Sequence, residues 1–94
     1  MAHFVLICQD KPSSLELRMA TREAHLAYAR ASGCVRAGGP FLDADCQPIG
    51  SMLIIETEGP SEAHSFASHD PYALAGLFAS VEVRPWRLAL GGFL

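Results

Sequence analysis

Charged residues are scarce in this sequence, and basic residues are the scarcer kind. Only 18% of the 94 residues are charged, and 7 Lys and Arg stand against 10 Asp and Glu, so the formal net charge is -3. Proteins that bind the nucleic-acid backbone do so with clustered Lys and Arg. The sequence therefore predicts no nucleic-acid partner.

Long apolar runs are missing too. No uninterrupted apolar stretch approaches the roughly 20 residues that a membrane-spanning helix needs. No basic segment precedes the short apolar run at residues 4–8, so the first residues do not have the form of a secretion signal. We therefore expect a cytoplasmic protein without membrane association.

Closely spaced metal ligands are absent as well. Cys8, Cys34 and Cys46 include no Cys-x-x-Cys pair, and their odd number leaves at least one unpaired. His64 and His69 are five positions apart, whereas two histidines on one helical face are four apart. These residues predict structural thiols and solvent-exposed histidines rather than a metal site.

Apolar residues, by contrast, are plentiful, at 50% of the chain. A chain of this length forms one domain, residues 1–94, with a small interior. The apolar excess indicates that more surface is buried than one small chain would bury by itself. We therefore expect a single domain that associates with a second copy of itself.

A long helix is predicted between Ser13 and Gly33. Ser13 and Glu16 have the Ser-x-x-Glu spacing of a capping box, and Gly33 supplies a C-terminal stop. Between these ends, apolar residues recur at helical spacing: Leu15, Met19, Leu26 and Ala29.

The remaining segments alternate between strand and helix signals. The predicted elements are strands at residues 4–9, 34–37, 50–56 and 80 to about 90, a second helix at 61–68, and a brief turn at 73–77, with Gly38, Gly39 and Pro40 ending the second strand. The order β-α-β-β-α-β is that of a ferredoxin-like α+β fold with an antiparallel sheet.

In that fold the first and third strands are central, and here both are apolar at successive positions, residues 5–7 and 53–55. Such strands need cover on both faces of the sheet. Two helices can cover only one face, so we expect the other face to meet the same face of a second chain in a homodimer. Pro85 in the fourth strand agrees with an edge position.

Arg22 and His25 are the first candidates for a functional site. Arg22 falls within the apolar stripe of the predicted helix, and His25 lies at its margin. One interpretation is a pocket in which His25 acts as a general acid or base and Arg22 holds an anionic group. The alternative is a boundary histidine beside an arginine whose stem packs while its charge reaches water.

Asp70, Ser51 and Tyr72 complete the candidate set. A carboxylate that accepts a hydrogen bond from an imidazole fixes its tautomer, so Asp70 could pair with His25. Alternatively, Asp70 only shapes the turn with Pro71 and Tyr72. Ser51 could offer a hydroxyl to a ligand, but it lacks the Gly-x-Ser-x-Gly context of a serine nucleophile.

Several segments together resemble the YCII-related, or YciI-like, family over essentially the whole chain. They are Ile7-Cys8-Gln9-Asp10-Lys11-Pro12, Arg22-Glu23-Ala24-His25-Leu26, Gly39-Pro40, Pro48-Ile49-Gly50-Ser51, Asp70-Pro71-Tyr72, Ala75-Gly76-Leu77 and Val83-Arg84-Pro85-Trp86. The resemblance implies a dimeric α+β barrel, in which two ferredoxin-like sheets pack face to face. It also implies a catalytic His-Asp pair at His25 and Asp70, with Arg22 and Ser51 in the pocket.

Two positions depart from the family pattern. Similar chains often have Pro where Glu23 stands and Gly where Cys46 stands. The second departure questions the left-handed turn expected of the hairpin between the second and third strands.

The sequence and the resemblance lead to one functional hypothesis and one alternative. The hypothesis is a dehydrochlorinase-like lyase or isomerase, since some relatives are lyase-like and one kind removes chloride from a chlorinated hydroxyquinone. His25 would move a proton on an anionic or aromatic small molecule, Asp70 would orient His25, and Arg22 would attract an anionic oxygen that Ser51 or Tyr72 hydrogen-bonds. This chemistry requires no cofactor and no metal. The alternative is a non-catalytic module that binds a small metabolite or a partner.

Overall fold

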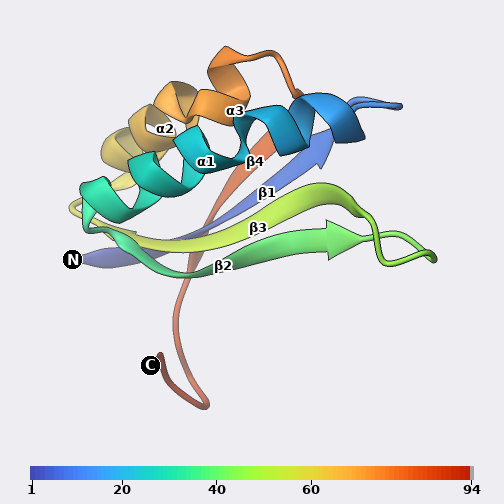
Figure 1. Cartoon of the computed structure of the whole chain (residues 1–94). Coiled ribbons are helices and arrows are strands. Elements are labelled where there is room, and N and C mark those ends of the chain that lie inside the picture. The colour runs from blue at the N-terminus through green and yellow to red at the C-terminus, as the bar shows by residue number, and fades with distance from the viewer. Residues whose placement is uncertain (94) are drawn as a thin grey trace.

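A computed structural model describes residues 1–93, within which four antiparallel strands form one sheet and three helices lie on one of its faces (Figure 1). The elements are β1 Ala2–Asp10, α1 Leu15–Ser32, β2 Val35–Leu42, β3 Pro48–Thr57, α2 Pro60–His69, α3 Pro71–Leu74 and β4 Phe78–Trp86. The strand order is β2-β3-β1-β4. The predicted α+β, ferredoxin-like arrangement is therefore confirmed, with β1 and β3 at the centre.

Two predicted strand boundaries are wrong. Gly38, Gly39 and Pro40 do not end β2 but lie inside it, paired with Leu53, Met52 and Ser51 of β3. A Gly-Gly-Pro segment reads locally as a turn, yet an edge strand tolerates proline because one of its sides needs no hydrogen-bond donor. The last strand, β4, covers Phe78–Trp86 instead of residues 80 to about 90. The short helix α3, Pro71–Leu74, takes up the first two residues of the turn predicted at 73–77.

The predicted capping box is also wrong. Ser14, not Ser13, is the N-cap of α1, and it makes no side-chain cap hydrogen bond. The Ser14 hydroxyl instead donates to the Pro12 carbonyl at 3.3 Å, while Ser13 has a φ of 57°. The C-terminal stop is confirmed, since Gly33 ends α1 in the left-handed conformation with a φ of 69°.

The hairpin between β2 and β3 keeps a left-handed residue without a glycine. Cys46 has a φ of 62°. The Asp43 carboxylate accepts hydrogen bonds from the backbone N–H groups of Asp45 and Gln47, at 2.8 and 3.0 Å. The Cys46 N–H donates to the Asp43 carbonyl at 3.0 Å. Asp43 thus offsets the conformational strain that a glycine would have avoided.

The hydrophobic core lies between the centre of the sheet and α2. Its buried members come from β1, β3 and α2: Phe4, Leu6, Cys8, Leu53, Ile55, Ala63, Phe66 and Ala67. Helix α1 contributes none of them, because its buried residues are Arg18 and His25. Met19, in the predicted apolar stripe, is 53% exposed. Helix α1 therefore covers the β2–β3 half of the sheet without filling the space beneath it.

The sheet face opposite the helices is also apolar. Val5 pairs with Ile54, and Ile7 pairs with Met52; directly paired residues project to the same face of a sheet. Val5, Ile7 and Ile54 are half-buried, and Met52 is 38% exposed. In Figure 1 the helices all lie on the other side of the sheet.

Among residues 1–93, no helix combines the length and the apolar character that crossing a membrane requires.

Two glycines in the β2–β3 hairpin test how closely β3 packs against β1. A Cβ on Gly50 would lie 2.5 Å from the Cys8 carbonyl oxygen of the neighbouring strand, whereas a Cβ on Gly39 would meet nothing within 4 Å. We expect Gly50→Ala to lower the free energy of unfolding by about 1–3 kcal/mol, because β1 and β3 must separate locally. Gly39→Ala should not lower it. Denaturant unfolding of both variants makes the comparison, and equal stabilities would contradict the packing.

Candidate functional site

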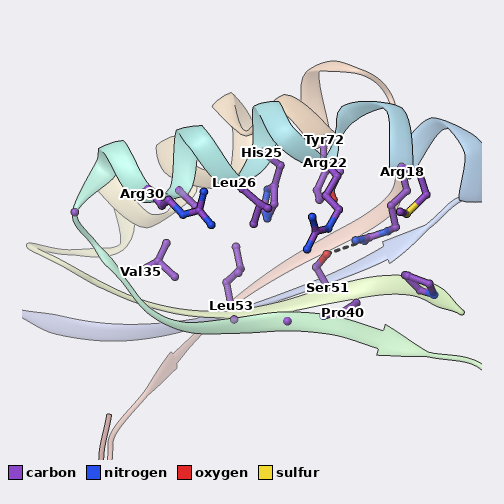
Figure 2. Close-up of a pocket in the computed structure, with 16 residues that line it drawn as sticks. Arg18, Arg22, His25, Leu26, Arg30, Val35, Pro40, Ser51, Leu53 and Tyr72 are labelled. Atoms are coloured by element: carbon purple, nitrogen blue, oxygen red, sulfur yellow. Dashed lines mark hydrogen bonds between the residues drawn. The ribbon is translucent and has the colours of Figure 1, made fainter. Parts of the chain in front are cut away.

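A cavity of about 600 Å³ lies between α1 and the β2–β3 half of the sheet (Figure 2). Four of the predicted site residues, Arg22, His25, Ser51 and Tyr72, line it. The fifth, Asp70, is 3% exposed and touches the cavity residue His25 from behind. The structure therefore brings together all five residues, although 45 positions separate His25 from Asp70.

The His25 ring is held by the Asp70 carboxylate. His25 Nδ1 lies 3.0 Å from Oδ1 and 2.9 Å from Oδ2 of Asp70, and both side chains are buried. An ionised carboxylate can only accept hydrogen bonds, so Nδ1 carries a hydrogen, and in the neutral ring Nε2 keeps a free lone pair. Among residues 1–93, Nε2 has no hydrogen-bond partner. This arrangement makes His25 available to take up and return a proton in the cavity.

Asp70 is fixed by its place between two helices. It ends α2 and begins α3 in an extended conformation, with a φ of -60° and a ψ of 133°, as expected for a residue before proline. Its Oδ1 also accepts the Tyr72 N–H at 2.8 Å. The two interpretations of Asp70 in the sequence are thus compatible, since one carboxylate both shapes the turn and holds His25.

Tyr72 packs flat against the His25 ring. The two ring centroids are 4.2 Å apart, with 17° between the planes. Tyr72 is 2% exposed, and burial raises the pKa of its phenol, outweighing the opposing effect of the Arg18 and Arg22 charges. Tyr72 is therefore a neutral wall beside the imidazole.

Arg18 is the main site residue that the sequence analysis missed. It is 4% exposed, and its guanidinium donates to both carboxylate oxygens of Asp10, at 2.7 and 3.0 Å. A further N–H donates to the Ser51 Oγ at 2.7 Å, the contact dashed in Figure 2. Burial alone would lower the pKa of Arg18, but the hydrogen bonds and charge of Asp10 raise it, so Arg18 stays cationic.

The position of Arg18 relative to His25 could have revealed it. The two residues are seven positions apart, which is about two turns of a helix and places them on one face. The guanidinium carbon of Arg18 also lies 4.6 Å from the centroid of the Tyr72 ring. Arg18, Tyr72 and His25 therefore form one packed group at the polar end of the cavity.

Two more arginines reach the cavity from α1. Arg22 is 52% exposed at its side chain, and its nearest carboxylate, Glu23, lies 3.7 Å away and is 88% exposed. Such an exposed pair contributes little, so Arg22 is able to turn to an anion in the cavity. Arg30, also missed in the sequence, lines the other end of the cavity, about 12 Å farther along the helix at 1.5 Å per residue.

Leu26, Leu53 and Gly38 form the apolar part of the cavity. Gly38 stands opposite Leu53 in the β2–β3 pair, and a Cβ on Gly38 would collide with the Leu53 side chain. Because Gly38 has no side chain, Leu53 can lie against β2, and these two residues form the floor of the cavity. Figure 2 shows Leu26 on the helix above Leu53. The cavity can thus hold an apolar ring whose polar substituents face His25, Arg22 and Ser51.

Neither a reactive thiol nor a metal cluster is found at this site. Burial raises the pKa of the Cys8 thiol to about 12, and the nearby Asp70 charge adds to the effect, so Cys8 stays protonated and is a poor nucleophile. Within the part of the chain that the structure describes, no three His, Cys, Asp or Glu side chains cluster as metal ligands. The polar side chains that line the cavity are those of His25, Ser51, Tyr72 and three arginines.

Comparison with solved structures places the fold beside an enzyme. A 5-chloro-2-hydroxyhydroquinone dehydrochlorinase (TftG) from Burkholderia phenoliruptrix AC1100, in complex with 2,5-dihydroxybenzoquinone, superimposes with a TM-score of 0.86 at 39% identity. The match covers 93% of this chain and 95% of that one. An antibiotic biosynthesis monooxygenase with a TM-score of 0.60 and 11% identity, covering 96% of this chain and all of that one, shares the fold alone.

Sequence comparison gives relatives that this chain matches over most of their length. Protein YciI of Escherichia coli O6:H1 is 34% identical, and the match covers 89% of this chain and 95% of that protein. An uncharacterized protein of Haemophilus influenzae is also 34% identical, with 90% of this chain and 96% of that protein covered. The model of the YCII-related domain matches residues 2–87. The chain therefore belongs to the YCII-related domain family, as its motifs predicted.

Proposed function

We propose that this protein is a small-molecule enzyme of the lyase or isomerase type, in which His25 and Asp70 form an acid/base pair. The observation that carries the proposal is the contact of His25 Nδ1 with both Asp70 oxygens beside a cavity of about 600 Å³. The 39% identity to a dehydrochlorinase in complex with 2,5-dihydroxybenzoquinone supports a hydroxylated aromatic or quinone-like substrate.

The proposed reaction begins with proton transfer to His25. Nε2 takes a proton from an acidic hydroxyl or carbon of the ring, and the electron pair of the broken bond stays on the substrate. The Asp70 carboxylate compensates the positive charge that this step places on the imidazole. Arg22 and Ser51 hold the oxygen on which negative charge collects.

The second half of the reaction decides its type. In a lyase, the electron pair moves through the ring and expels an anionic leaving group such as halide, so that the net change is loss of H⁺ and the anion. In an isomerase, His25 returns the proton to a different atom of the ring. Both outcomes use the same base and the same oxygen-binding residues, and neither consumes an oxidant or a reductant.

Replacement of the pair tests this proposal. We expect His25→Ala to lower turnover of a chlorinated hydroxyhydroquinone by roughly a hundred- to ten-thousand-fold, because the proton acceptor is lost. Asp70→Asn should remove most of the activity, because an amide cannot compensate the imidazolium. His69→Ala, at an exposed histidine of the same chain, is the matched control. Full turnover in both site variants, measured beside unchanged circular dichroism, would discard the mechanism.

The shape of the cavity has its own test. We expect Gly38→Ala to weaken binding of 2,5-dihydroxybenzoquinone roughly tenfold or more, since the new methyl group pushes Leu53 into the space for the ring. Gly39→Ala, whose methyl group would meet nothing within 4 Å, should leave the affinity unchanged. Titration calorimetry compares the two variants. Equal affinities would rule out the Gly38–Leu53 floor as the ring-binding surface.

We also propose that the protein acts as a homodimer joined through the sheet face that the helices leave uncovered. The central pairs Val5–Ile54 and Ile7–Met52 lie on this face, where a second apolar surface would remove them from water. The segment after β4 leaves on the same side of the sheet (Figure 1), and its Leu90 is 91% exposed. Face-to-face pairing of two copies would bury both features.

Disruption of this face tests the pairing. We expect the protein to sediment at twice its chain mass of 10.1 kDa, and Ile54→Glu to produce single chains, because a carboxylate would be buried without a partner. Leu74→Glu, at a leucine of α3 that is 70% exposed, should leave the dimer intact. Analytical ultracentrifugation at micromolar concentration decides the question. A wild-type mass of one chain would reject the dimer.

A further inference from the structure

The hydroxyl group of Ser51 can both donate and accept a hydrogen bond, and its contact with Arg18 uses only the acceptor. Arg18 donates to Ser51 Oγ at 2.7 Å, and a guanidinium has donors but no acceptor. Ser51 Oγ must therefore accept in this contact, and its own hydrogen is not used there. Among residues 1–93, Ser51 has no other side-chain hydrogen bond. Because Ser51 is 4% exposed and lines the cavity, its hydrogen is available to a molecule in the cavity.

Arg18 cannot easily change this arrangement. Its side chain and that of Asp10 are each 5% exposed, and two hydrogen bonds join them. A bidentate pair of this kind fixes the plane of the guanidinium. Asp10 in turn ends β1, and its neighbour Lys11 is tied by a backbone hydrogen bond to Leu77. The N–H that faces Ser51 is thus held in place by the contact of α1 with the end of β1.

We infer that Asp10 and Arg18 make Ser51 an obligate hydrogen-bond donor, and that the cavity consequently binds the deprotonated oxygen of an acidic phenol or enol. Arg18 is a positioning residue here, since it acts through Ser51. A hydroxyl that accepts from a cation is a stronger donor, because hydrogen bonds in a chain polarise one another. The inference rests on the proposed function for the identity of the site, but it concerns binding and does not require turnover.

The charges around the site suit an anionic oxygen when His25 is protonated. The Asp10 carboxylate is neutralised by Arg18, and Tyr72 and Cys8 are uncharged. Asp70 remains, and His25 neutralises it when Nε2 gains a proton. When the ligand's O–H bond breaks and its proton passes to Nε2, the electron pair stays on the ligand oxygen, which Ser51 and the half-exposed Arg22 then face. The transfer thus converts a neutral imidazole and a neutral ligand into an imidazolium and a ligand anion.

The probe 4-nitrocatechol tests the inference, because its visible absorption reports whether it is ionised. At a fixed pH where free 4-nitrocatechol is mostly neutral, we expect the wild-type protein to bind it as the anion. Ser51→Ala should weaken binding roughly ten- to hundredfold, as expected for loss of a hydrogen bond to a charged group, and shift the bound spectrum toward the neutral form. Ser51→Thr keeps the hydroxyl and should retain the anionic spectrum.

Asp10→Asn separates positioning from simple stability. It keeps the shape of the side chain but removes the charge that anchors Arg18, so the bound spectrum should move toward the neutral form while Ser51 is intact. A purely structural Asp10 would lower the melting temperature and leave the bound spectrum unchanged, which would overturn the role of Arg18. Ser68→Ala, at an exposed serine, is the control.

Three outcomes would overturn the inference as a whole. They are a bound spectrum of neutral 4-nitrocatechol in the wild-type protein, an unchanged affinity and spectrum in Ser51→Ala, and no binding at millimolar probe. Failure of the proposed enzyme activity would look different. In that case the anionic probe would still bind through Ser51, while no chlorinated hydroxyhydroquinone would be turned over.

Discussion

Helix α1 buries an arginine and a histidine where a helix on a sheet usually buries apolar side chains. Arg18 and His25 are its buried residues, and a buried polar group is stable only when its hydrogen-bonding partners are supplied. Asp10, Ser51 and Asp70 supply them. These contacts hold the helix over the β2–β3 half of the sheet without a close-packed apolar interface, and the space that remains is the cavity.

The two carboxylates divide the work of this site. Asp10 compensates Arg18 permanently, whereas Asp70 holds the His25 ring and can compensate a proton on it. Each carboxylate has a cationic or protonatable partner, so an anion in the cavity meets no uncompensated negative charge once His25 is protonated. Tyr72 packs between the two groups, contacting the His25 ring and the Arg18 guanidinium.

The stability of the fold comes from a different part of the sheet. The core lies where α2 packs on β1 and β3, so α1 is free to carry polar residues. The outer face of the same strands presents the apolar residues Val5, Ile7, Ile54 and Met52. Each central strand thus serves the core with one set of alternate residues and the proposed dimer interface with the other set.

Local signals in the sequence determined the order of the elements, the C-terminal end of α1 at Gly33, and the His25 and Asp70 candidates. These features could be predicted because helical periodicity, turn residues and family motifs each depend on a few neighbouring positions in the chain. The extent of β2 was decided only by its pairing with β3, which overrode the turn signal of Gly38, Gly39 and Pro40. The capping box predicted at Ser13 failed for a local reason, since the N-cap is Ser14, whose hydroxyl donates to the Pro12 carbonyl.

The burial of Arg18 was likewise decided by the tertiary structure. An arginine on a predicted helix is ordinarily exposed, and nothing near it in the chain says that Asp10 and Ser51 will meet it, because they reach it only once β1 and β3 lie side by side under α1. The sequence alone determined which side chains could do the chemistry. Long-range packing decided which of them share one cavity and which hydrogen each one offers to it. The physical reason is that a buried charge is stable only beside its partners, and only the folded chain brings those partners within hydrogen-bond distance.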